Sequence, residues 1–357
     1  MILLWYTVRR FLSTIAFAVI ALCVLFVIID LIENLAKFID KGVPFGILAW
    51  YYIVYIPDIA KLLIPVACLL AALFVVGRMA STNEVTAMKA AGISTVRFLI
   101  PFLIVGMLIS VAQVWFSGWV VPNANSAKLH LVQTSMGGGG TNVLQNLYFR
   151  DTSNRNVHIG TYNEEQRTAY NVVVEDFTDS VSVRLVWRME AATMYWNPKL
   201  GWVAPSARIR SFSTNGMTIR WEHNWPVPFT VRYNQIARLQ LSVSELTFDQ
   251  VHDYIETLRK GGKNTRRQEI DYYAGWAFPF SSLIVILLAV PIAARRRKAG
   301  IAVNIAIAMV ITFFYIAFSE ISKSVGAGTQ ADPLVIAWSA NMMFFLLGLV
   351  SLAVFRR

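Results

Sequence analysis

Residues 11 to 29 read FLSTIAFAVIALCVLFVII, a run of 19 residues from Phe11 to Ile29 that contains no charge. A helix of this length crosses the roughly 30 Å hydrocarbon core of a bilayer. Arg9 and Arg10 precede the run, which continues into Asp30 without the small-residue site at which a signal peptide is cleaved. We therefore expect an uncleaved anchor, and with it a membrane protein.

The rest of the chain contains five further apolar runs of spanning length. Hydrophobic residues make up 56% of the 357 residues and charged residues only 15%, which is unlike an ordinary soluble domain. The further runs are Trp50 to Val76, Phe98 to Val121, Tyr273 to Ala294, Ile301 to Ile321 and Leu334 to Phe355. The sequence thus predicts a polytopic α-helical membrane protein with six transmembrane helices and both termini on one side.

Basic residues gather on the side that holds the termini. Eleven Lys and Arg residues and one acidic residue, Glu84, lie there, which accounts for +10 of the +11 net charge. Cytoplasmic loops are enriched in Lys and Arg, so we expect cytoplasmic termini. Topology explains the charge, and no nucleic acid partner is expected. The eleven are Arg9, Arg10, Arg78, Lys89, Arg97, Arg295, Arg296, Arg297, Lys298, Arg356 and Arg357.

Between Pro122 and Ile270 the hydropathy pattern changes to alternating polar and apolar residues, and no stretch could span a bilayer. We predict an inserted, mainly antiparallel β domain over residues 122–270, on the side opposite the termini. Three transmembrane helices in residues 1–121 precede it and three in residues 271–357 follow it. Strands are expected at Val172 to Glu175, Val181 to Trp187, Ala207 to Phe212 and Met217 to Trp221, with a hairpin turn at Asn197 to Gly201.

Two other segments of the inserted domain have recognisable patterns. Gly137 to Gly140 predicts a flexible loop, because no Lys-Ser/Thr follows it as in a phosphate-binding loop. Ser244 to Lys260 has helical spacing and stops at Gly261 and Gly262. We expect this domain to bind a lipid chain in an apolar interior or a like domain along an edge strand; a purely structural role stays open.

Motifs of known catalytic chemistry are missing from the sequence. The histidines do not have metal-ligand spacing, and no G-x-S-x-G elbow occurs. The nearest approach to a Walker motif, Gly261 to Asn264, lacks the leading glycine spacing and the Ser/Thr that binds magnesium. Cys23 and Cys68 lie inside predicted spans and suggest packing. We expect no metal, no cofactor and no covalent catalysis. The histidines are His130, His158, His223 and His252.

The segment between spans two and three, STNEVTAMKAAGIS from Ser81 to Ser94, predicts a short cytoplasmic helix near residues 82–92. Ser81 with Glu84 fits a capping box, and Gly92 suits the C-terminal cap. Val85 and Met88 share one face. Such a helix suits docking on a soluble motor whose Arg would pair with Glu84. An interfacial helix lying on lipid is the alternative that the residues leave open.

Several short motifs and the order of the spans resemble a known family. The motifs are Asn83 to Ser94, Leu63-Ile64-Pro65 in span two, and Asp332-Pro333, Ala337-Trp338-Ser339-Ala340-Asn341 and Gly348 in the last span. With three spans, a β domain and three spans, the whole chain is similar to the LptF/LptG family, the permease subunits of the lipopolysaccharide-exporting ABC transporter. The two paralogues share these patterns.

This resemblance implies a multi-pass inner-membrane permease with a periplasmic β-jellyroll-like domain, and a transport subunit rather than an enzyme. It implies that a paralogous permease pairs with the chain and that an LptB-like ATPase dimer binds the coupling helices. Lipopolysaccharide would be extracted from the inner membrane and passed to LptC- and LptA-like periplasmic proteins. Glu84 falls on the family's coupling-helix carboxylate, and Val85 and Met88 lie beside it.

Four lysines near the expected periplasmic membrane face could meet lipid A phosphates: Lys37, Lys41, Lys61 and Lys323. Asp58 with Lys61 and Glu320 with Lys323 are spaced i,i+3, so mutual neutralisation is the alternative. Two other functions stay open. One is a membrane-anchored envelope sensor or scaffold with a ligand-binding β domain. The other is a membrane enzyme acting on lipid or glycan, which would need catalytic groups facing a cavity.

Overall fold

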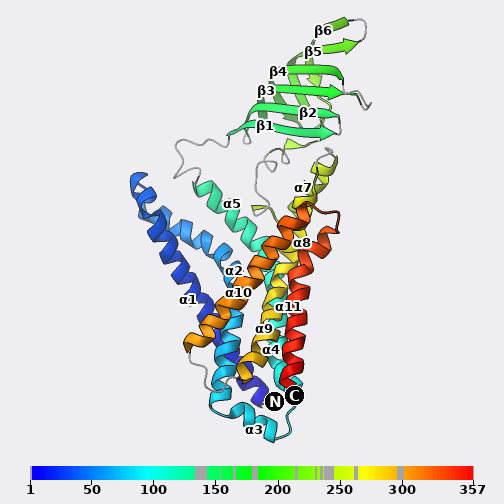
Figure 1. Ribbon diagram of the computed structural model, residues 1–357. Coiled ribbons are helices and arrows are strands. Elements are labelled where there is room, and N and C mark those ends of the chain that lie inside the picture. Colours follow the sequence, from blue (N-terminus) through cyan, green and yellow to red (C-terminus); the bar gives the residue numbers. More distant parts are fainter. Residues whose placement is uncertain are drawn as a thin grey trace. The chain divides into compact units, whose positions relative to one another are not determined.

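A computed structural model describes residues 2–132, 143–152, 154–163, 166–178, 184–213, 216–229, 231–233, 236, 245–260, 264–295 and 301–356. The chain divides into two compact units, one formed by residues 1–131 and 269–357 and the other by residues 132–268. The first unit is helical and the second contains a β-sheet (Figure 1). Each unit has its own hydrophobic core.

Six helices of the described residues are long and apolar enough to cross a membrane, as predicted. They extend over Trp5–Asp40, Phe45–Ser81, Val96–Leu131, Arg266–Ala294, Ile305–Ala327 and Pro333–Val354. Each overlaps the corresponding predicted run. The third continues to Leu131 instead of ending near Val121, because polar residues such as Asn123 and Asn125 stay helical after the apolar run ends.

The helical unit is built from elements that combine into these spans. The first half holds α1 (Ile2–Asp40), α2 (Phe45–Ser81), α3 (Glu84–Ala90), α4 (Thr95–Trp115), a π-helical turn η1 (Phe116–Val120) and α5 (Val121–Leu131). The second half holds α8 (Arg266–Ala277), a 3-10 turn η4 (Phe278–Phe280), α9 (Ser281–Arg295), α10 (Ile301–Ala327) and α11 (Pro333–Arg356). The start of α1, the end of α11 and all of α3 lie at one end of this unit (Figure 1).

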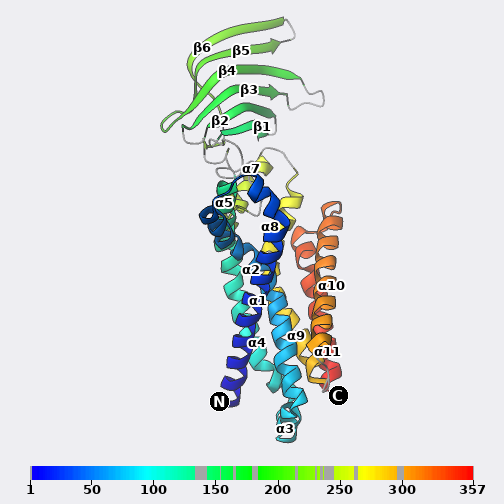
Figure 2. The ribbon, with the colours of Figure 1, turned by 90° about the vertical axis from the view of Figure 1, so that its left-hand side faces the viewer.

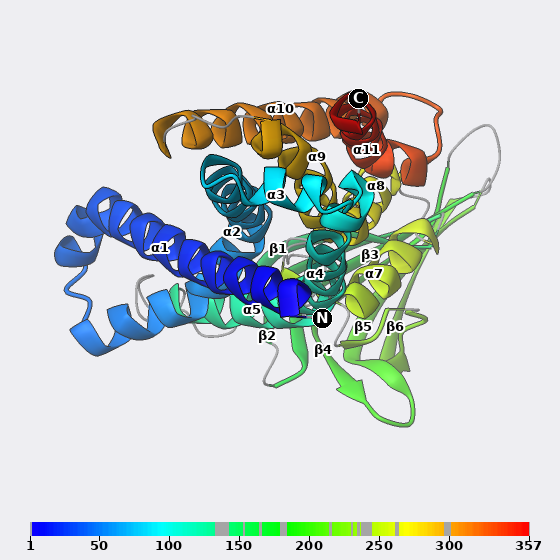
Figure 3. The same cartoon turned by 90° about the horizontal axis from the view of Figure 1, so that it is seen from below.

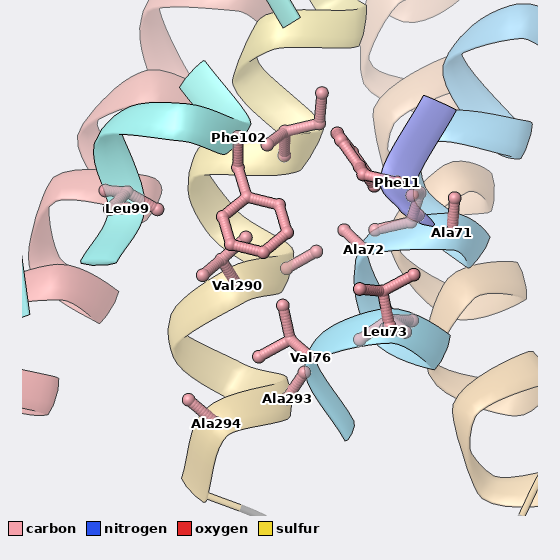
Figure 4. Close-up of a cluster of buried hydrophobic side chains, with 14 of the residues drawn as sticks. Phe11, Ala71, Ala72, Leu73, Val76, Leu99, Phe102, Val290, Ala293 and Ala294 are labelled. Carbon is pink, nitrogen blue, oxygen red and sulfur yellow. The ribbon is translucent and has the colours of Figure 1, made fainter. Parts of the chain in front are cut away.

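Helices α2 and α9 form the centre of the helical unit, whereas α1 and α10 lie at its margins (Figure 3). The most apolar windows of the spans containing α2 and α9 are 67% and 78% buried, against 11% for α1 and for α10. The core includes Phe11 of α1, whose ring meets that of Phe102 of α4 edge-on with centroids 5.1 Å apart (Figure 4). The marginal helices therefore leave most of their apolar surface uncovered within this chain.

Two glycines allow neighbouring helices to approach α9 closely. A Cβ atom on Gly106 of α4 would lie 2.8 Å from Ile286 Cδ1, and one on Gly348 of α11 would lie 3.0 Å from Leu287 Cδ2. Larger side chains would have to displace these buried neighbours. The glycines thus fix α9 between α4 and α11.

The second unit contains a six-stranded antiparallel sheet whose strands follow one another in sequence order (Figure 2). The expected jellyroll-like domain is, within the described residues, a single meander without Greek-key crossovers. The strands are β1 (Val143–Thr152), β2 (Arg155–Asn163), β3 (Thr168–Phe177), β4 (Leu185–Asn197), β5 (Gly201–Ser213) and β6 (Gly216–Pro226).

One face of the sheet forms the core of this unit. Strand alternation directs Phe149, Val157, Val174, Met189 and Ile209 to that face, in one row across five paired strands. Residues that follow β6 cover the row, including Val227, Val231 and Ile236. The opposite face carries charged side chains such as Glu190 and Arg208, together with the exposed apolar side chains of Ile219 and Trp221.

Most sequence predictions for this unit agree with the structure where it is described. The turn after Asn197 is present, with Asn197 Oδ1 accepting from Lys199 N at 2.9 Å and Leu200 N at 3.3 Å. Helix α7 (Phe248–Lys260) occupies the predicted helical segment. Strands β1 and β2 were not predicted, although Leu147 and Phe149 alternate with polar residues. Residues 137–140, 181–183, 244, 261 and 262 lie outside the described residues.

Candidate functional site

The short helix α3 ends in a well-formed cap. Gly92 has a left-handed φ of +79°, which glycine adopts without steric cost. Its N–H donates to Lys89 O at 3.0 Å, and the Ile93 N–H donates to Met88 O at 3.0 Å. These two bonds make a Schellman motif, which stops the helix at Ala90 and confirms the role expected for Gly92.

The capping box expected at the start of α3 was wrong. Helix α2 continues through Ser81, so the Ser81 hydroxyl donates back to Arg78 O at 2.8 Å instead of reaching α3. The N-cap residue is Asn83, with a left-handed φ of 61° and no side-chain cap. Glu84 Oε1 instead accepts from Thr82 Oγ1 at 2.9 Å. A tight turn therefore joins α2 to α3.

Val85 and Met88 face inward, toward the chain's own core. Their exposed fractions are 6% and 8%, and they belong to the same cluster as Phe11, Met79 and Phe98. Hydrophobic burial thus fastens α3 to α1, α2 and α4. The opposite side of α3 is exposed and made of small or polar residues, which are Thr86, Ala87, Lys89 and Ala90.

Glu84 lies at the junction between α3 and α1. One Arg10 guanidinium nitrogen is 4.0 Å from Glu84 Oε1, and both side chains are partly exposed. Arg10 also lies over the Tyr6 ring, 4.6 Å from its centroid. Sequence reasoning identified Glu84 but not this partner, because residues 74 positions apart carry no signal of proximity in one sequence.

The four predicted substrate lysines fall into two pairs. Lys37 lies in the last turn of α1 and Lys41 directly follows the helix; both are exposed, and Lys37 Nζ donates to Asn34 Oδ1 at 2.9 Å. The ammonium groups of Lys61 of α2 and Lys323 of α10 repel each other electrostatically. Helix packing thus brings Lys61 and Lys323 together from distant parts of the sequence.

Two acidic residues accompany the second pair. Lys323 Nζ lies 2.5 Å from Glu320 Oε1, the i,i+3 neutralisation that the spacing suggested. Asp58 interacts electrostatically with Lys61 and accepts a hydrogen bond from Asn125 Nδ2 at 3.3 Å. These four charges sum to zero, whereas Lys37 and Lys41 keep more of theirs available to solvent.

A buried polar link joins three helices near these lysines and was not predicted. Gln113 of α4 donates from Nε2 to Lys61 O at 3.0 Å, and its Oε1 accepts from Ser282 Oγ of α9 at 2.8 Å. The π-helical turn η1 follows shortly after Gln113. Such turns inside helices are frequent at functional sites. The available signal in the sequence was the presence of polar residues, such as Gln113 and Ser282, in otherwise apolar runs.

Asn341, one of the motif residues of the last span, has a structural role. Tyr315 Oη donates to Asn341 Oδ1 at 2.8 Å, and Asn341 Nδ2 donates to Ala277 O at 2.6 Å. The side chain thereby ties α10, α11 and α8 together. Within the described residues, no three His, Cys, Asp or Glu side chains gather as metal ligands would, and Cys23 and Cys68 are buried free thiols.

Comparison with known proteins gives one family. A family model described as "Lipopolysaccharide export system permease LptF/LptG" matches residues 5–356. The lipopolysaccharide export system permease protein LptG of Escherichia coli strain K12 is 20% identical over 338 residues, which cover 91% of this chain and 92% of that protein. LptG of Escherichia coli O6:H1 matches with the same identity and coverage. With its six apolar helices and inserted β-sheet, this chain belongs to the LptF/LptG family of multi-pass inner-membrane permeases for lipopolysaccharide export.

Proposed function

We propose that this chain is one of two permease subunits that extract lipopolysaccharide from the inner membrane and pass it to a periplasmic bridge. An LptB-like ATPase dimer on the cytoplasmic side supplies the energy, and the chain itself performs no covalent chemistry. The observation that carries the proposal is α3, a capped helix with an exposed polar side and two side chains buried in the core. A force applied to α3 reaches the transmembrane helices through that core.

In this proposal, Glu84 pairs with an Arg of the ATPase while Val85 and Met88 transmit the movement. The two apolar residues thus act from inside the permease, and the partner meets the small polar residues on the outer side of α3. Packed interiors transmit displacement because they lack free volume. The interfacial alternative, in which α3 lies on lipid, is disfavoured because its apolar residues face away from any lipid surface.

The marginal helices suit a second permease. Phe17 of α1 is 73% exposed, and Met309 and Phe313 of α10 are each 67% exposed. Apolar faces of membrane helices contact lipid or another helix. We propose that a paralogous permease covers part of these two helices, so that the substrate cavity forms between the subunits.

The lysines and the β-sheet are assigned to the periplasmic side in this proposal. Basic residues such as Arg78 and Arg97 lie at the helix ends next to α3, and they favour a cytoplasmic location for that end of the helical unit. Lys37, Lys41, Lys61 and Lys323 would then meet lipid A phosphates. The edge strand β6, which pairs with β5 in the described residues, would accept a strand of an LptC- or LptA-like domain.

The first experiment is mild-detergent purification of the tagged chain from its native membrane, with mass spectrometry of stoichiometric partners and an ATPase assay. A Walker-motif ATPase recovered with a second six-span permease supports the proposal. Recovery of the chain alone without ATPase activity would favour the sensor or scaffold. Topology is tested by thiol labelling of Thr86→Cys and Thr218→Cys in intact cells, where only Thr218→Cys is expected to react with an impermeant reagent.

A further inference from the structure

The face of the β-sheet opposite its core carries two rows of paired side chains. Strand alternation and the observed register define them. The first row is Tyr148, His158, Val173, Glu190 and Arg208, and the second is Arg150, Asn156, Glu175, Arg188 and Arg210. The rows cross five strands, so charged and polar side chains extend across most of this face.

This surface has an excess of positive charge. Glu190 accepts from Arg210 at 2.8 Å and from Arg208, and it lies 2.9 Å from Arg188. Arg188 also bonds Glu175 at 3.1 Å. The two rows therefore hold four guanidinium groups and two carboxylates. The Nε of Arg150 donates to the neutral amide of Asn156 at 3.1 Å, which leaves its charge for an anion.

A hollow of about 600 Å³ opens over the β1 to β4 part of these rows. Its lining includes Tyr148, Arg150, Asn156, His158, Glu175 and Arg188. The Tyr148 ring is stacked on His158 with centroids 4.1 Å apart and an interplanar angle of 17°. Tyr148 is 70% exposed, so the outer face of this ring is free to receive a flat ligand surface.

His158 lines the same hollow as the stacking partner of Tyr148. Its Nε2 is buried and has no hydrogen-bond partner among the described residues, so this atom is closed to a ligand. The hollow thus combines an aromatic platform, amide and carboxylate groups and an available guanidinium.

We infer that this hollow binds a phosphorylated saccharide. A sugar ring stacks on Tyr148, its hydroxyls bond Asn156 and Glu175, and its phosphate bonds Arg150. This inference rests on the proposed function only for the source of the ligand, since the head group of lipopolysaccharide is a phosphorylated saccharide. A free phosphorylated sugar has the same chemistry.

The test uses the full-length chain in nanodiscs of zwitterionic lipid, without the ATPase. Calorimetric titrations compare deacylated lipopolysaccharide, glucosamine 6-phosphate and inorganic phosphate. Tyr148→Ala and Arg150→Gln are each expected to weaken binding of both saccharides about tenfold, and Tyr148→Phe to leave it unchanged. Arg220→Gln is the matched control, because it removes an exposed arginine from the other face of the same sheet.

The arms separate the possible sources. Tighter binding of deacylated lipopolysaccharide assigns the site to the lipid head group, and tighter binding of glucosamine 6-phosphate assigns it to a free sugar. The inference is overturned if inorganic phosphate binds as tightly as either saccharide, or if neither saccharide binds. It is also overturned if Arg220→Gln weakens saccharide binding as much as Tyr148→Ala and Arg150→Gln do. Failure here leaves the export proposal intact, because partner recovery and ATPase coupling do not depend on this assay.

A second measurement needs no variant that could unfold. Hydroxyl-radical footprinting of the wild-type chain reports the exposure of single side chains with and without ligand. Glucosamine 6-phosphate is expected to protect Tyr148 and not Trp221, which is 64% exposed on β6 beyond the hollow. Equal protection of both residues, or of neither, overturns the site.

Discussion

The guanidinium of Arg10 lies 4.0 Å from the carboxylate of Glu84, so the first turns of α1 meet the first residue of α3. Both side chains are partly exposed, and ion pairs of this kind contribute about 1 kcal/mol or less to stability. The contact is therefore more informative about position than about folding. It places an intramolecular cation next to Glu84, the carboxylate that we propose pairs with an Arg of the ATPase.

Replacing Glu84 should separate coupling from folding. Glu84→Ala and Glu84→Arg are expected to weaken ATPase docking at least about tenfold, as for loss of a charge-assisted bond, and to change the unfolding free energy by less than about 1 kcal/mol. Co-purification and thermal unfolding measure the two effects. Arg10→Gln is the control, because it breaks the same intramolecular pair but keeps Glu84. Unchanged assembly and transport in Glu84→Arg would refute the assignment.

The cap of α3 can be tested through its glycine. Gly92→Ala places a Cβ at φ +79° with nothing within 4 Å, so its cost of about 1 kcal/mol is a backbone cost at the end of α3. We expect weaker ATPase coupling. Gly42→Ala is matched, since Gly42 has φ +59° and equally open space after α1. Equal loss of coupling in both variants would show that the cap has no special role.

The buried polar link predicts opposite outcomes for two buried serines. Ser282→Ala leaves Gln113 Oε1 without the 2.8 Å bond and should destabilise the chain by about 1 kcal/mol. Ser110 is equally buried, but its hydroxyl has no partner among the described residues, so Ser110→Ala should be neutral or stabilising. Thermal unfolding in detergent measures both. A larger loss in Ser110→Ala than in Ser282→Ala would contradict the link.

The lysine pairs should differ in their contribution to substrate binding. Lys41→Gln is expected to reduce lipopolysaccharide-stimulated ATPase activity of the complex several-fold, because Lys41 is exposed. Lys323→Gln should have less effect, because Glu320 already lies 2.5 Å from its ammonium group. Glu320→Gln, which frees Lys323, is expected to raise the response. The reverse order for Lys41 and Lys323 would argue against this use of charge.

The ion pairs in the two rows of paired side chains make the stability of the β-sheet sensitive to acid. Hydrogen bonding from Arg208 holds the pKa of Glu190 below its usual value. The folded state therefore binds fewer protons here than the unfolded state, so this stabilisation is present above the ordinary pKa of a glutamate and is lost as pH falls through the lowered value. In Glu190→Gln, the unfolding free energy should decline less as pH falls, and tryptophan fluorescence of the unfolding transition measures it. Glu222→Gln, which removes a carboxylate from β6, should retain the full decline.

Most of the helical unit was predictable, because a span needs a long apolar run and the sequence displays six of them. The helix ends were less so. The third span continues through Asn123 and Asn125, since a helix already started propagates through polar residues. Strands β1 and β2 were missed although Leu147 and Phe149 alternate with polar residues such as Arg150, which is the pattern of a half-buried strand.

The site residues around α3 stay a prediction, and their arrangement could not be read from the sequence. The helix-end rule for Gly92 holds in the structure, whereas the capping box that pointed to Glu84 does not form. The inward direction of Val85 and Met88 could not be predicted, since one sequence does not show which surface a short helix covers. The proximity of Lys61 to Lys323 depends on helix packing between distant segments, which leaves no trace in spacing.

The inward direction of Val85 and Met88 has a consequence for how the proposed complex would be handled. Because the apolar side chains of α3 are buried within the permease, a partner would contact mainly the charged and small polar groups of this helix. Attraction between exposed charges is screened within about 10 Å at 0.1 M salt. Docking at this helix should therefore weaken as ionic strength rises, and a wash in concentrated salt would remove the ATPase while leaving the permease folded in its detergent.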